Sequence, residues 1–291
     1  MGFEGKVAII TGAGGGLGRE HALLLASLGA RVVVNDLGGS VHGIGTSDAA
    51  DQVVEEIKSA GGEAVANKDS VADKEGAKQI VQTAVDAFGT VDILINNAGI
   101  LRDKSFKNMD LDDWDAVINV HLNGTAYVTR HAWPIMYEKN YGRIVFTSSG
   151  AGIFGNFGQA NYAAAKMGMV GLMNTLAMEG AAHNVRVNAL SPGASTRMGA
   201  TIPGRDDDPA APDPANHPRL VSPAVALLVS DDAPTGRIVA AAGGRFGSDL
   251  IFHNKPVNLG LDANYDDVVA HADEILATDN AVLKAGFWRE D

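Results

Sequence analysis

Short apolar runs alternate along most of the chain with longer segments in which apolar residues recur every three or four positions. The short runs, such as Val7-Ala8-Ile9-Ile10, are typical of buried parallel strands, and the longer segments are typical of helices that bury one face. Strands are predicted at residues 7–10, 31–36, 63–67, 91–95, 144–146, 185–190 and 238–242. Helices are predicted through residues 22–28 and at residues 47–60, 74–88, 112–139, 158–182, 224–229 and 266–278.

This alternation predicts an α/β protein with one doubly wound parallel sheet of the Rossmann type, about seven strands and helices on both faces. We expect residues 1–245 to form one catalytic, dinucleotide-binding domain. Residues 194–223, rich in proline, are expected to form a mobile substrate lid rather than a long helix. A disordered acidic loop without contacts is the alternative for that segment. Residues 246–291 are predicted to be a C-terminal extension with one helix packed on the domain.

Composition narrows the possible partners. The net charge of −12 disfavours nucleic acid, and the absence of cysteine excludes disulfides and cysteine metal sites. The histidines show no metal-site spacing, so no metal is expected. No apolar run reaches the roughly 18 residues that a membrane span needs, and no signal core follows the N-terminus. We therefore expect a cytoplasmic protein that acts on a small molecule and binds neither nucleic acid nor membrane.

A glycine-rich turn follows the first strand. The segment Thr11-Gly12-Ala13-Gly14-Gly15-Gly16-Leu17-Gly18 stands between that strand and a helix. Glycines let the backbone turn tightly and approach a pyrophosphate, which the free N–H groups at a helix start attract. Gly12, Gly16, Leu17 and Gly18 are therefore predicted to bind a dinucleotide.

The acid at the end of the second strand, Asp36, indicates which dinucleotide binds. A carboxylate there accepts hydrogen bonds from a ribose 2′-hydroxyl and repels the 2′-phosphate of NADP. NAD is the predicted cofactor. The alternative reading of Asp36 is an acid that only forms a turn.

Polar and small residues also follow the third and fourth strands. Asp69-Ser70 ends the third strand, and Asn96-Asn97-Ala98-Gly99 ends the fourth. Small residues at this edge would let an adenosine lie close, whereas an asparagine can equally tie neighbouring strands together. Asp69, Ser70, Asn97, Ala98 and Gly99 are assigned to the cofactor site.

The segment from residue 143 to 166 contains the candidate chemistry. Tyr162 and Lys166 are four positions apart, so on a helix they share one face. A neighbouring ammonium is expected to lower the pKa of the phenol toward neutrality, where it can exchange protons. Ser149 lies close to the predicted strand end. A buried strand followed by an ordinary core helix is the alternative reading.

The predicted helix at 112–139 contains Asn119, a polar residue between apolar neighbours. It is either a satisfied core residue or a residue that loosens the helix and holds a water. Pro134 is expected to bend the helix. His121 and His131 are interpreted as packing or surface residues.

Together these motifs resemble the short-chain dehydrogenase/reductase family over residues 5–245. The resemblance implies that Tyr162 is the general acid/base and that Ser149 holds the substrate oxygen. It also implies that Lys166 binds the nicotinamide ribose and that Asn119 holds a water for proton relay. Pro192-Gly193 matches a cofactor motif of the family, and a homodimer or homotetramer through residues 112–139 and 158–182 is implied.

Within that family, several runs resemble the (3R)-hydroxyacyl-CoA dehydrogenase modules of peroxisomal multifunctional enzymes and their bacterial stand-alone relatives. These runs are residues 35–39, 99–103, 155–162 and 196–198. The resemblance implies oxidation of a 3-hydroxyacyl-CoA, fatty or steroid-derived. Because the lid differs from one expected for CoA, two alternatives stay open: a carbonyl reductase or hydroxysteroid dehydrogenase, and an NAD-binding regulatory protein without turnover.

Overall fold

The computed structural model describes residues 2–196, 198, 213–279 and 281–283. The chain divides into two compact units, residues 1–248 and 249–291.

The first unit is built on one eight-stranded sheet with the strand order β3-β2-β1-β4-β5-β6-β7-β8. Neighbouring strands from β3 to β7 pair in parallel, for example Ala8 with Val32 and Ile93. The strands are β1 (Val7–Thr11), β2 (Arg31–Asn35), β3 (Glu63–Asn67), β4 (Ile93–Asn96), β5 (Gly142–Thr147), β6 (Val185–Gly193), β7 (Ile238–Ala242) and β8 (Arg245–Asp249). The predicted Rossmann-type fold is confirmed.

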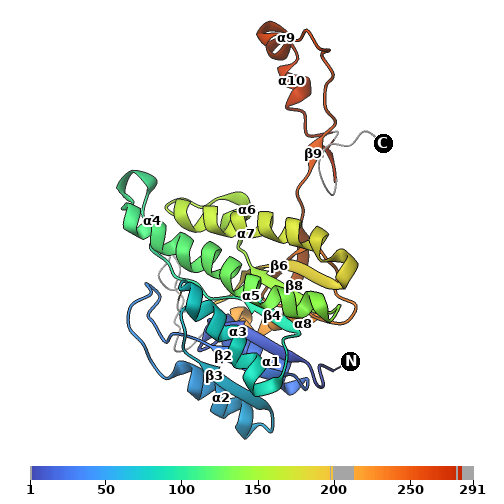
Figure 1. The fold of residues 1–291 in the computed structure, drawn as a ribbon. Helices are drawn as coiled ribbons and strands as arrows, with labels where there is room; N and C mark the ends of the chain where they lie inside the picture. The colour runs from blue at the N-terminus through green and yellow to red at the C-terminus, as the bar shows by residue number, and fades with distance from the viewer. Residues whose placement is uncertain (1, 197, 199–212, 280, 284–291) are drawn as a thin grey trace. The chain divides into compact units, whose positions relative to one another are not determined.

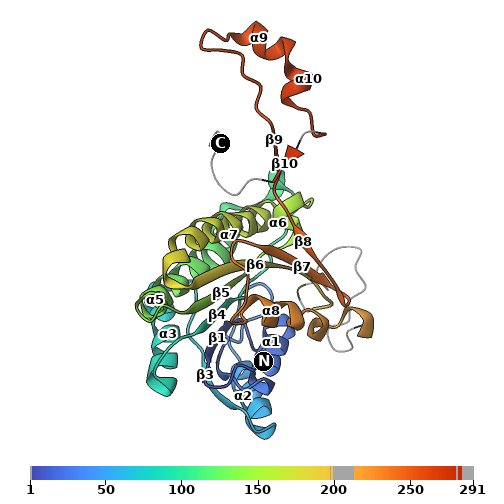
Figure 2. The same cartoon turned by 90° about the vertical axis from the view of Figure 1, so that its right-hand side faces the viewer.

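Strand β8 was not predicted. It lies beside β7 at the edge of the sheet, as Figure 2 shows. Gly243 and Gly244 connect the two strands with φ values of 54° and 73°, the left-handed region that glycine adopts most readily. A two-residue connection can join only antiparallel strands, so β8 closes an otherwise parallel sheet. The sheet therefore has one strand more than expected.

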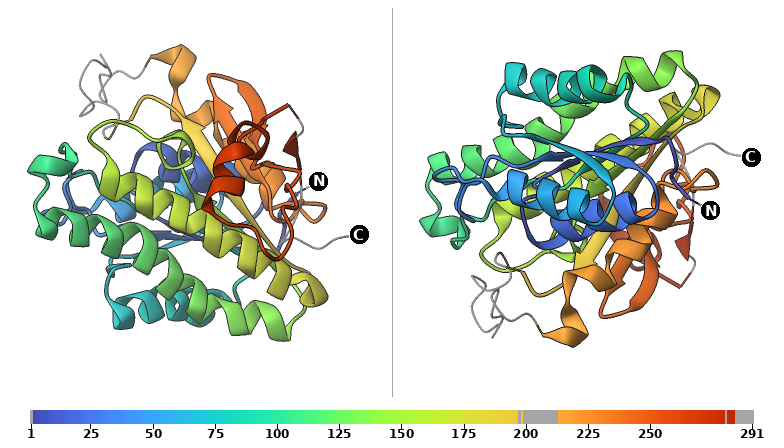
Figure 3. Two further views of the ribbon diagram at one scale, coloured as in Figure 1. Left: turned by 90° about the horizontal axis from the view of Figure 1, so that it is seen from above. Right: turned by 90° about the horizontal axis from the view of Figure 1, so that it is seen from below.

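Helices cover both faces of the sheet (Figures 1 and 3). One core cluster contains residues of α1 (Gly16–Ser27), α2 (Ala49–Ser59) and α8 (Ser222–Leu228). The opposite cluster contains residues of α3 (Lys74–Phe88), α5 (Gly124–Glu138) and α7 (Ala160–Glu179). The strands between them supply side chains to both clusters, which explains their continuous apolar sequences.

The predicted helix at 112–139 is interrupted. It begins as α4 (Leu111–Ile118), passes through a π-helical turn (Asn119–Asn123) and continues as α5. Nδ2 of Asn123 donates to Oδ1 of Asn119 at 2.7 Å across this turn. Of the two alternatives left open for Asn119, the structure therefore shows the loosened helix. Widened single turns of this kind occur frequently at functional sites.

The second unit contains two short helices where one was predicted. Helix α9 (Tyr265–Ala270) begins with a capping box between Asn264 and Asp267, and α10 (Ala272–Ile275) follows after His271. His271 has a non-helical conformation, with φ −105° and ψ 16°. Strands β9 (His253–Asn254) and β10 (Ala281–Val282) pair antiparallel. Among the helices described in either unit, none combines the length and apolarity that crossing a membrane requires.

Strand order places the site. The chain leaves β1 to one side for β2 and returns to the other side for β4. Connections that diverge in this way open a crevice at the carboxyl ends of the strands, where doubly wound proteins bind their ligands.

Candidate active site

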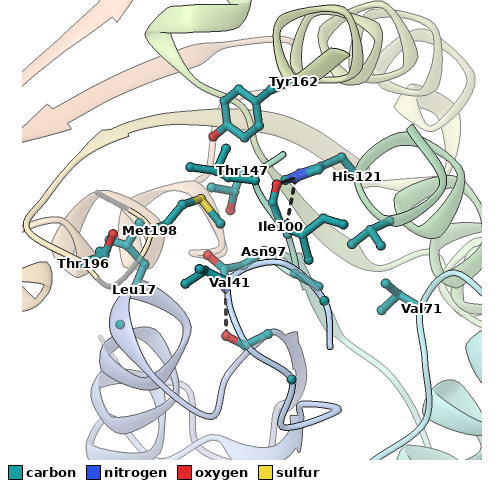
Figure 4. Close-up of a pocket in the computed structure, with 18 of the residues that line it drawn as sticks. Leu17, Val41, Val71, Asn97, Ile100, His121, Thr147, Tyr162, Thr196 and Met198 are labelled. Carbon is teal, nitrogen blue, oxygen red and sulfur yellow. Dashed lines mark hydrogen bonds between the residues drawn. The ribbon is translucent and has the colours of Figure 1, made fainter. Parts of the chain in front are cut away.

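A cavity of about 550 Å³ lies at this crevice (Figure 4). It is lined by residues that follow strands β1, β2, β3, β4, β5 and β6, together with the start of α7. Every residue predicted for the site lines it except Gly18. The predicted residues that line it are Gly12, Gly16, Leu17, Asp36, Asp69, Ser70, Asn97, Ala98, Gly99, Asn119, Ser149, Tyr162, Lys166, Pro192 and Gly193.

The glycine-rich turn packs against the end of β4. Gly12 and Gly16 have φ values of 65° and 54°. A Cβ on Gly12 would lie 2.7 Å from the Cα of Ala98, so a larger residue cannot fit. Asn97 donates from Nδ2 to the carbonyls of Thr11 (3.0 Å) and Gly12 (3.1 Å), and thus ties β4 to the turn. Asn97 therefore ties neighbouring strands together, which is one of the two roles considered for it from the sequence.

Helix α1 begins directly after this turn. Its N-cap residue is Gly15, which has no side chain to accept a hydrogen bond from the N–H groups of the first turn. Those N–H groups can therefore donate hydrogen bonds to an anion such as a pyrophosphate, which the helix dipole also attracts.

Gly18→Ala is expected to weaken dinucleotide binding at least about tenfold and to lower stability by about 1–3 kcal/mol. The reason is that the new Cβ would lie 2.3 Å from the carbonyl oxygen of Gly12 and push the turn apart. Gly171→Ala is the matched control, because Gly171 is also helical and a Cβ added there would meet nothing within 4 Å. Calorimetric titration and thermal unfolding measure both variants. The control should gain up to about 1 kcal/mol from helix propensity, and equal losses in both variants would contradict the packing argument.

Asp36 is fixed at the end of β2 by two backbone donors. Its Oδ2 accepts from the N–H of Gly14 at 2.8 Å, and its Oδ1 accepts from the N–H of Gly38 at 2.7 Å. Each carboxylate oxygen keeps a further lone pair for a ligand hydroxyl. The carboxylate therefore lies beside the glycine turn, where a ribose would bind.

Asp69 and Ser70 line the cavity after β3. Oδ2 of Asp69 accepts from Nδ2 of Asn67 at 2.7 Å, and the Asp69 carbonyl accepts from Nδ2 of Asn35 at 2.9 Å. Ser70 Oγ accepts from the N–H of Ala72. The two asparagines, which the sequence analysis did not single out, set the position of this wall.

Ser149, Tyr162 and Lys166 are brought together by α6 (Gly150–Phe154) and α7. Ser149 caps α6, and Tyr162 and Lys166 lie one turn apart at the start of α7. Nζ of Lys166 lies 5.3 Å from the centre of the Tyr162 ring and donates to the carbonyl of Thr147. Ser148 Oγ instead donates to the Lys166 carbonyl at 3.0 Å, which leaves Ser149 as the serine that faces the phenol.

The pKa values in this group run opposite to the sequence-based expectation. Burial raises the pKa of Tyr162 to about 12, although a hydrogen bond with Ser149 lowers it. Burial also lowers the pKa of Lys166 to about 7, which weakens its ability to stabilise a phenolate. Tyr162 lines the cavity and is only partly accessible to solvent, so its phenolate would be poorly hydrated. The prediction of a lowered Tyr162 pKa is therefore wrong for the chain alone.

Asn119 and His121 have different surroundings. Asn119 is exposed, although it lines the cavity, and its side-chain oxygen accepts from Asn123. His121 is 1% exposed, and its ring centre lies 5.1 Å from that of Tyr162 at an interplanar angle of 84°. The sequence analysis treated His121 only as a packing or surface residue. The position of His121 two residues after Asn119, in the same helical segment, was the feature of the sequence that could have indicated its closeness to Tyr162.

Half of the predicted lid, residues 197 and 199–212, lies outside the described residues, including Arg197, Arg205 and the acidic run at 206–208. Of its described part, Thr196 and Met198 line the cavity. Strand β6 continues through Pro192 and Gly193, which pair with Ala241 and Ala242, so it runs three residues beyond its predicted end at residue 190. No group of three or more potential metal ligands occurs among the residues that the structure describes.

Comparisons with known proteins agree with this geometry. The family of short chain dehydrogenases matches residues 6–205. A short-chain type dehydrogenase/reductase of Mycobacterium tuberculosis is 47% identical over 290 residues, covering 98% of this chain and 99% of that protein. Peroxisomal multifunctional enzyme type 2 of Mus musculus is 56% identical over 201 residues, covering 69% of this chain but 27% of the mouse protein. The crystal structure of a short chain dehydrogenase from Mycobacterium avium aligns with a TM-score of 0.81 and 42% identity, over 94% of this chain and 95% of that one.

Fold and site thus define a Rossmann-type oxidoreductase of the kind that uses a nicotinamide dinucleotide. The chain belongs to the short-chain dehydrogenase/reductase family, as its motifs predicted.

Proposed function

We propose that this enzyme oxidises a secondary alcohol with NAD, and that the alcohol is the 3-hydroxyl of a fatty or steroid-derived 3-hydroxyacyl-CoA. The observation that carries the proposal is that Ser149, Tyr162, Lys166 and Asp36 all line one cavity. Hydride transfer from an alcohol requires an acid/base beside a bound nicotinamide dinucleotide, and Asp36 would select NAD as that dinucleotide.

The chain's own residues fit a bound NAD. The turn at Gly12 has no room for a side chain, and the N-cap residue of α1 has no side chain that could occupy an anion's place. The Lys166 ammonium has three N–H donors, and one of them makes a hydrogen bond among the described residues. When bound, the nicotinamide accepts the hydride. Ser149 would hold the substrate oxygen, and Tyr162 as phenolate would remove the hydroxyl proton. Lys166 would hold the ribose and, when charged, offset the effect of burial on the Tyr162 pKa.

Asp36→Asn is expected to lower kcat/KM for NAD about tenfold and to raise it for NADP. The amide keeps an oxygen acceptor but no longer carries the charge that repels a 2′-phosphate. Steady-state kinetics with both cofactors measure the ratio. If wild type already used NADP as well as NAD, Asp36 would not select the cofactor.

The surface beside Ser149 favours an apolar acyl group. Phe154 and Phe157 follow Ser149 closely and are 76% and 91% exposed. Exposed large apolar side chains are candidates for contact with an apolar ligand. The nearby cations Arg102 and Lys104 already pair with Asp113 at 3.3 and 2.9 Å. Support for the CoA part comes from the sequence resemblance to (3R)-hydroxyacyl-CoA dehydrogenase modules.

A substrate panel tests the proposal. Formation of NADH is followed with 3-hydroxyacyl-CoA thioesters of increasing chain length and with free steroid alcohols, and consumption of NADH is followed with simple ketones. We expect the thioesters to be oxidised with the higher kcat/KM. Turnover of steroid alcohols alone would indicate a hydroxysteroid dehydrogenase, and reduction of simple ketones alone would indicate a carbonyl reductase. NAD binding without turnover of any substrate would indicate a regulatory protein.

Three further expectations belong to the same proposal. Residues 194–223 form the substrate lid, and the chain is cytoplasmic. It assembles as a homodimer or homotetramer through α4, α5 and α7, on which Leu111 and Met178 are 79% and 74% exposed.

A further inference from the structure

The loop before α7 gives the start of this helix, and therefore Tyr162, little support of its own. Gly155 and Gly158 in the loop have φ values of 81° and 83°, in the region that glycine adopts most readily. The N-cap residue of α7 is Gln159, and its side chain accepts no hydrogen bond from the first turn. The position of the phenol must therefore be fixed by contacts with another part of the chain.

The segment that follows β4 supplies such contacts through its backbone. The N–H of Lys104 donates to the carbonyl of Gly158 at 2.9 Å. The carbonyl of Arg102 accepts from Nδ2 of Asn161 at 3.2 Å, and Asn161 is completely buried. These two hydrogen bonds fasten the segment to the loop and to the first turn of α7.

A third contact between the two segments is made by side chains. Nε2 of Gln159 donates to Oδ2 of Asp103 at 2.7 Å, and Oε1 of Gln159 accepts from Nδ2 of Asn156 at 2.8 Å. Gln159 lines the cavity and is 4% exposed. Because an ionised carboxylate can only accept, Asp103 determines which end of the Gln159 amide faces it. The first residue of the helix is thus held from both sides.

The Asp103 carboxylate is only half satisfied. Its Oδ1 is buried and has no hydrogen-bond partner among the described residues. Burial raises the pKa of Asp103, whereas the hydrogen bond from Gln159 and the charge of His42 lower it. An unpaired buried carboxylate oxygen costs stability, and groups of this kind are found preferentially at functional sites. The place of Asp103 beside the acid/base helix therefore needs an explanation beyond stability.

We propose that Asp103 is a positioning residue for the acid/base, and that through Gln159 it holds the first turn of α7 and the phenol of Tyr162 against the segment after β4. The inference rests on the proposed function, in which Tyr162 takes the hydroxyl proton of the alcohol. Asp103 itself does not line the cavity, so it acts only through its neighbours.

The charge of Asp103 is not neutralised by its surroundings. Arg102 and Lys104, its neighbours in the chain, pair with Asp113 on α4 at 3.3 and 2.9 Å. His42, in the loop after β2, is the cationic group that acts on the carboxylate. Among the described residues, no ion pair includes Asp103. Its negative charge can therefore act on the groups of α7 that it faces.

Tyr162 receives that charge. Burial and the Asp103 carboxylate raise the pKa of Tyr162, and a hydrogen bond with Ser149 lowers it. The other titratable groups beside the phenol are Lys166, on the same helix, and His121, whose pKa burial and Lys166 hold well below its ordinary value. Removing the Asp103 charge should therefore let the phenolate form at lower pH. Removing its hydrogen bond as well should displace the phenol.

The test separates these two effects with two variants. Asp103→Asn removes the charge but keeps a carbonyl oxygen that accepts from Gln159, whereas Asp103→Leu removes both. We expect Asp103→Asn to keep kcat at high pH within about threefold of wild type. The pH at which kcat is half-maximal should fall, so that below this pH the variant is about two- to fivefold faster than wild type. Asp103→Leu should lose about 10- to 100-fold in kcat, with the NAD dissociation constant changed less than about threefold.

A double-variant experiment tests whether Asp103 acts through Gln159. Gln159→Met keeps a side chain of similar length but cannot donate to the carboxylate. It should lower kcat about as much as Asp103→Leu does. Because both substitutions break the same hydrogen bond, the two losses should not multiply when they are combined.

Asp92→Asn is the matched control. Asp92 is also a buried aspartate, 9% exposed, whose carboxylate accepts from a backbone N–H, that of Val7 at 2.8 Å. It does not line the cavity. The control variant should lose stability and keep the pH profile of kcat. Three results would overturn the inference: equal losses of kcat in both Asp103 variants, an unchanged pH profile in Asp103→Asn, or the same shift of the profile in Asp92→Asn.

Two further measurements do not depend on turnover. The ultraviolet titration of Tyr162 in the cofactor-free protein, isolated by subtracting the Tyr162→Phe variant, should move to lower pH in Asp103→Asn. Amide hydrogen exchange at residues 158–163 should be faster in Asp103→Leu than in wild type or Asp103→Asn. If no alcohol is oxidised but both changes occur, the proposed function fails and the role of Asp103 stands. Unchanged titration and exchange would overturn the role of Asp103 even in an active dehydrogenase.

Discussion

Tyr162→Phe is expected to lower kcat about 10³-fold, because the variant has no group that can take the hydroxyl proton in the transition state. The ring remains, so its edge-to-face contact with His121 and its place beside Lys166 are kept. The NAD dissociation constant should therefore change less than about twofold. Stopped-flow formation of NADH gives the rate, and calorimetric titration gives the binding constant.

Tyr127→Phe is the control for this result. Tyr127 is on α5, packs near Lys74 and does not line the cavity. Its hydroxyl should be dispensable, so kcat should stay within about twofold of wild type. A Tyr162→Phe enzyme with more than about a tenth of wild-type kcat would show that another group exchanges the proton.

A strand or helix could be predicted from the sequence where the apolar pattern of its own residues agrees with the way it packs in the fold. Strand β3 (63–67) and helix α3 (74–88) lie at the predicted boundaries. Asp73 caps α3 by accepting from Gly76, and Gly89 ends it with a left-handed φ of 84°. Strand β8 shows the opposite case. Its side chains are largely exposed, so it has no apolar run, and only pairing with β7 makes it a strand.

The position of the site followed from the sequence because its residues come at strand ends. Parallel strands bring their carboxyl ends to one edge, which gathered Asp36, Asn97 and Ser149 without knowledge of any contact. The sequence did not reveal how deeply these groups are buried. Burial reversed the expected direction of the Tyr162 pKa, and it placed the ring of His121 directly against Gly99.

Lys166 illustrates a conflict between stability and chemistry in the cofactor-free protein. Its ammonium is almost completely removed from water, and burial lowers its pKa from 10.5 to about 7. Between these values the unfolded chain binds a proton that the folded chain does not, so stability rises with pH across this window. Below pH 7 both states are protonated, and the folded state carries the whole cost of the buried charge. That cost is on the order of 5 kcal/mol at most, since one pKa unit corresponds to about 1.4 kcal/mol.

Lys166→Met is therefore expected to stabilise the cofactor-free protein at pH 6 while lowering kcat at least about 100-fold. The methionine fills similar space without charge, although the Thr147 carbonyl loses its donor, which offsets part of the gain. A net gain of about 1–3 kcal/mol would raise Tm by several degrees. The gain should shrink as the pH approaches 9, because the wild-type lysine is then neutral in the folded state.

Thermal unfolding of both proteins at pH 6, 7.5 and 9 measures this difference. Lys58→Met, at a lysine on α2 that is about half exposed, is the control and should show no pH-dependent change in Tm relative to wild type. A Lys166→Met protein that is less stable than wild type by the same amount at every pH would mean that the ammonium is well solvated or well paired in the folded state. Lys166 could not then have a lowered pKa, and its charge would be available to Tyr162 at neutral pH without help from a bound cofactor.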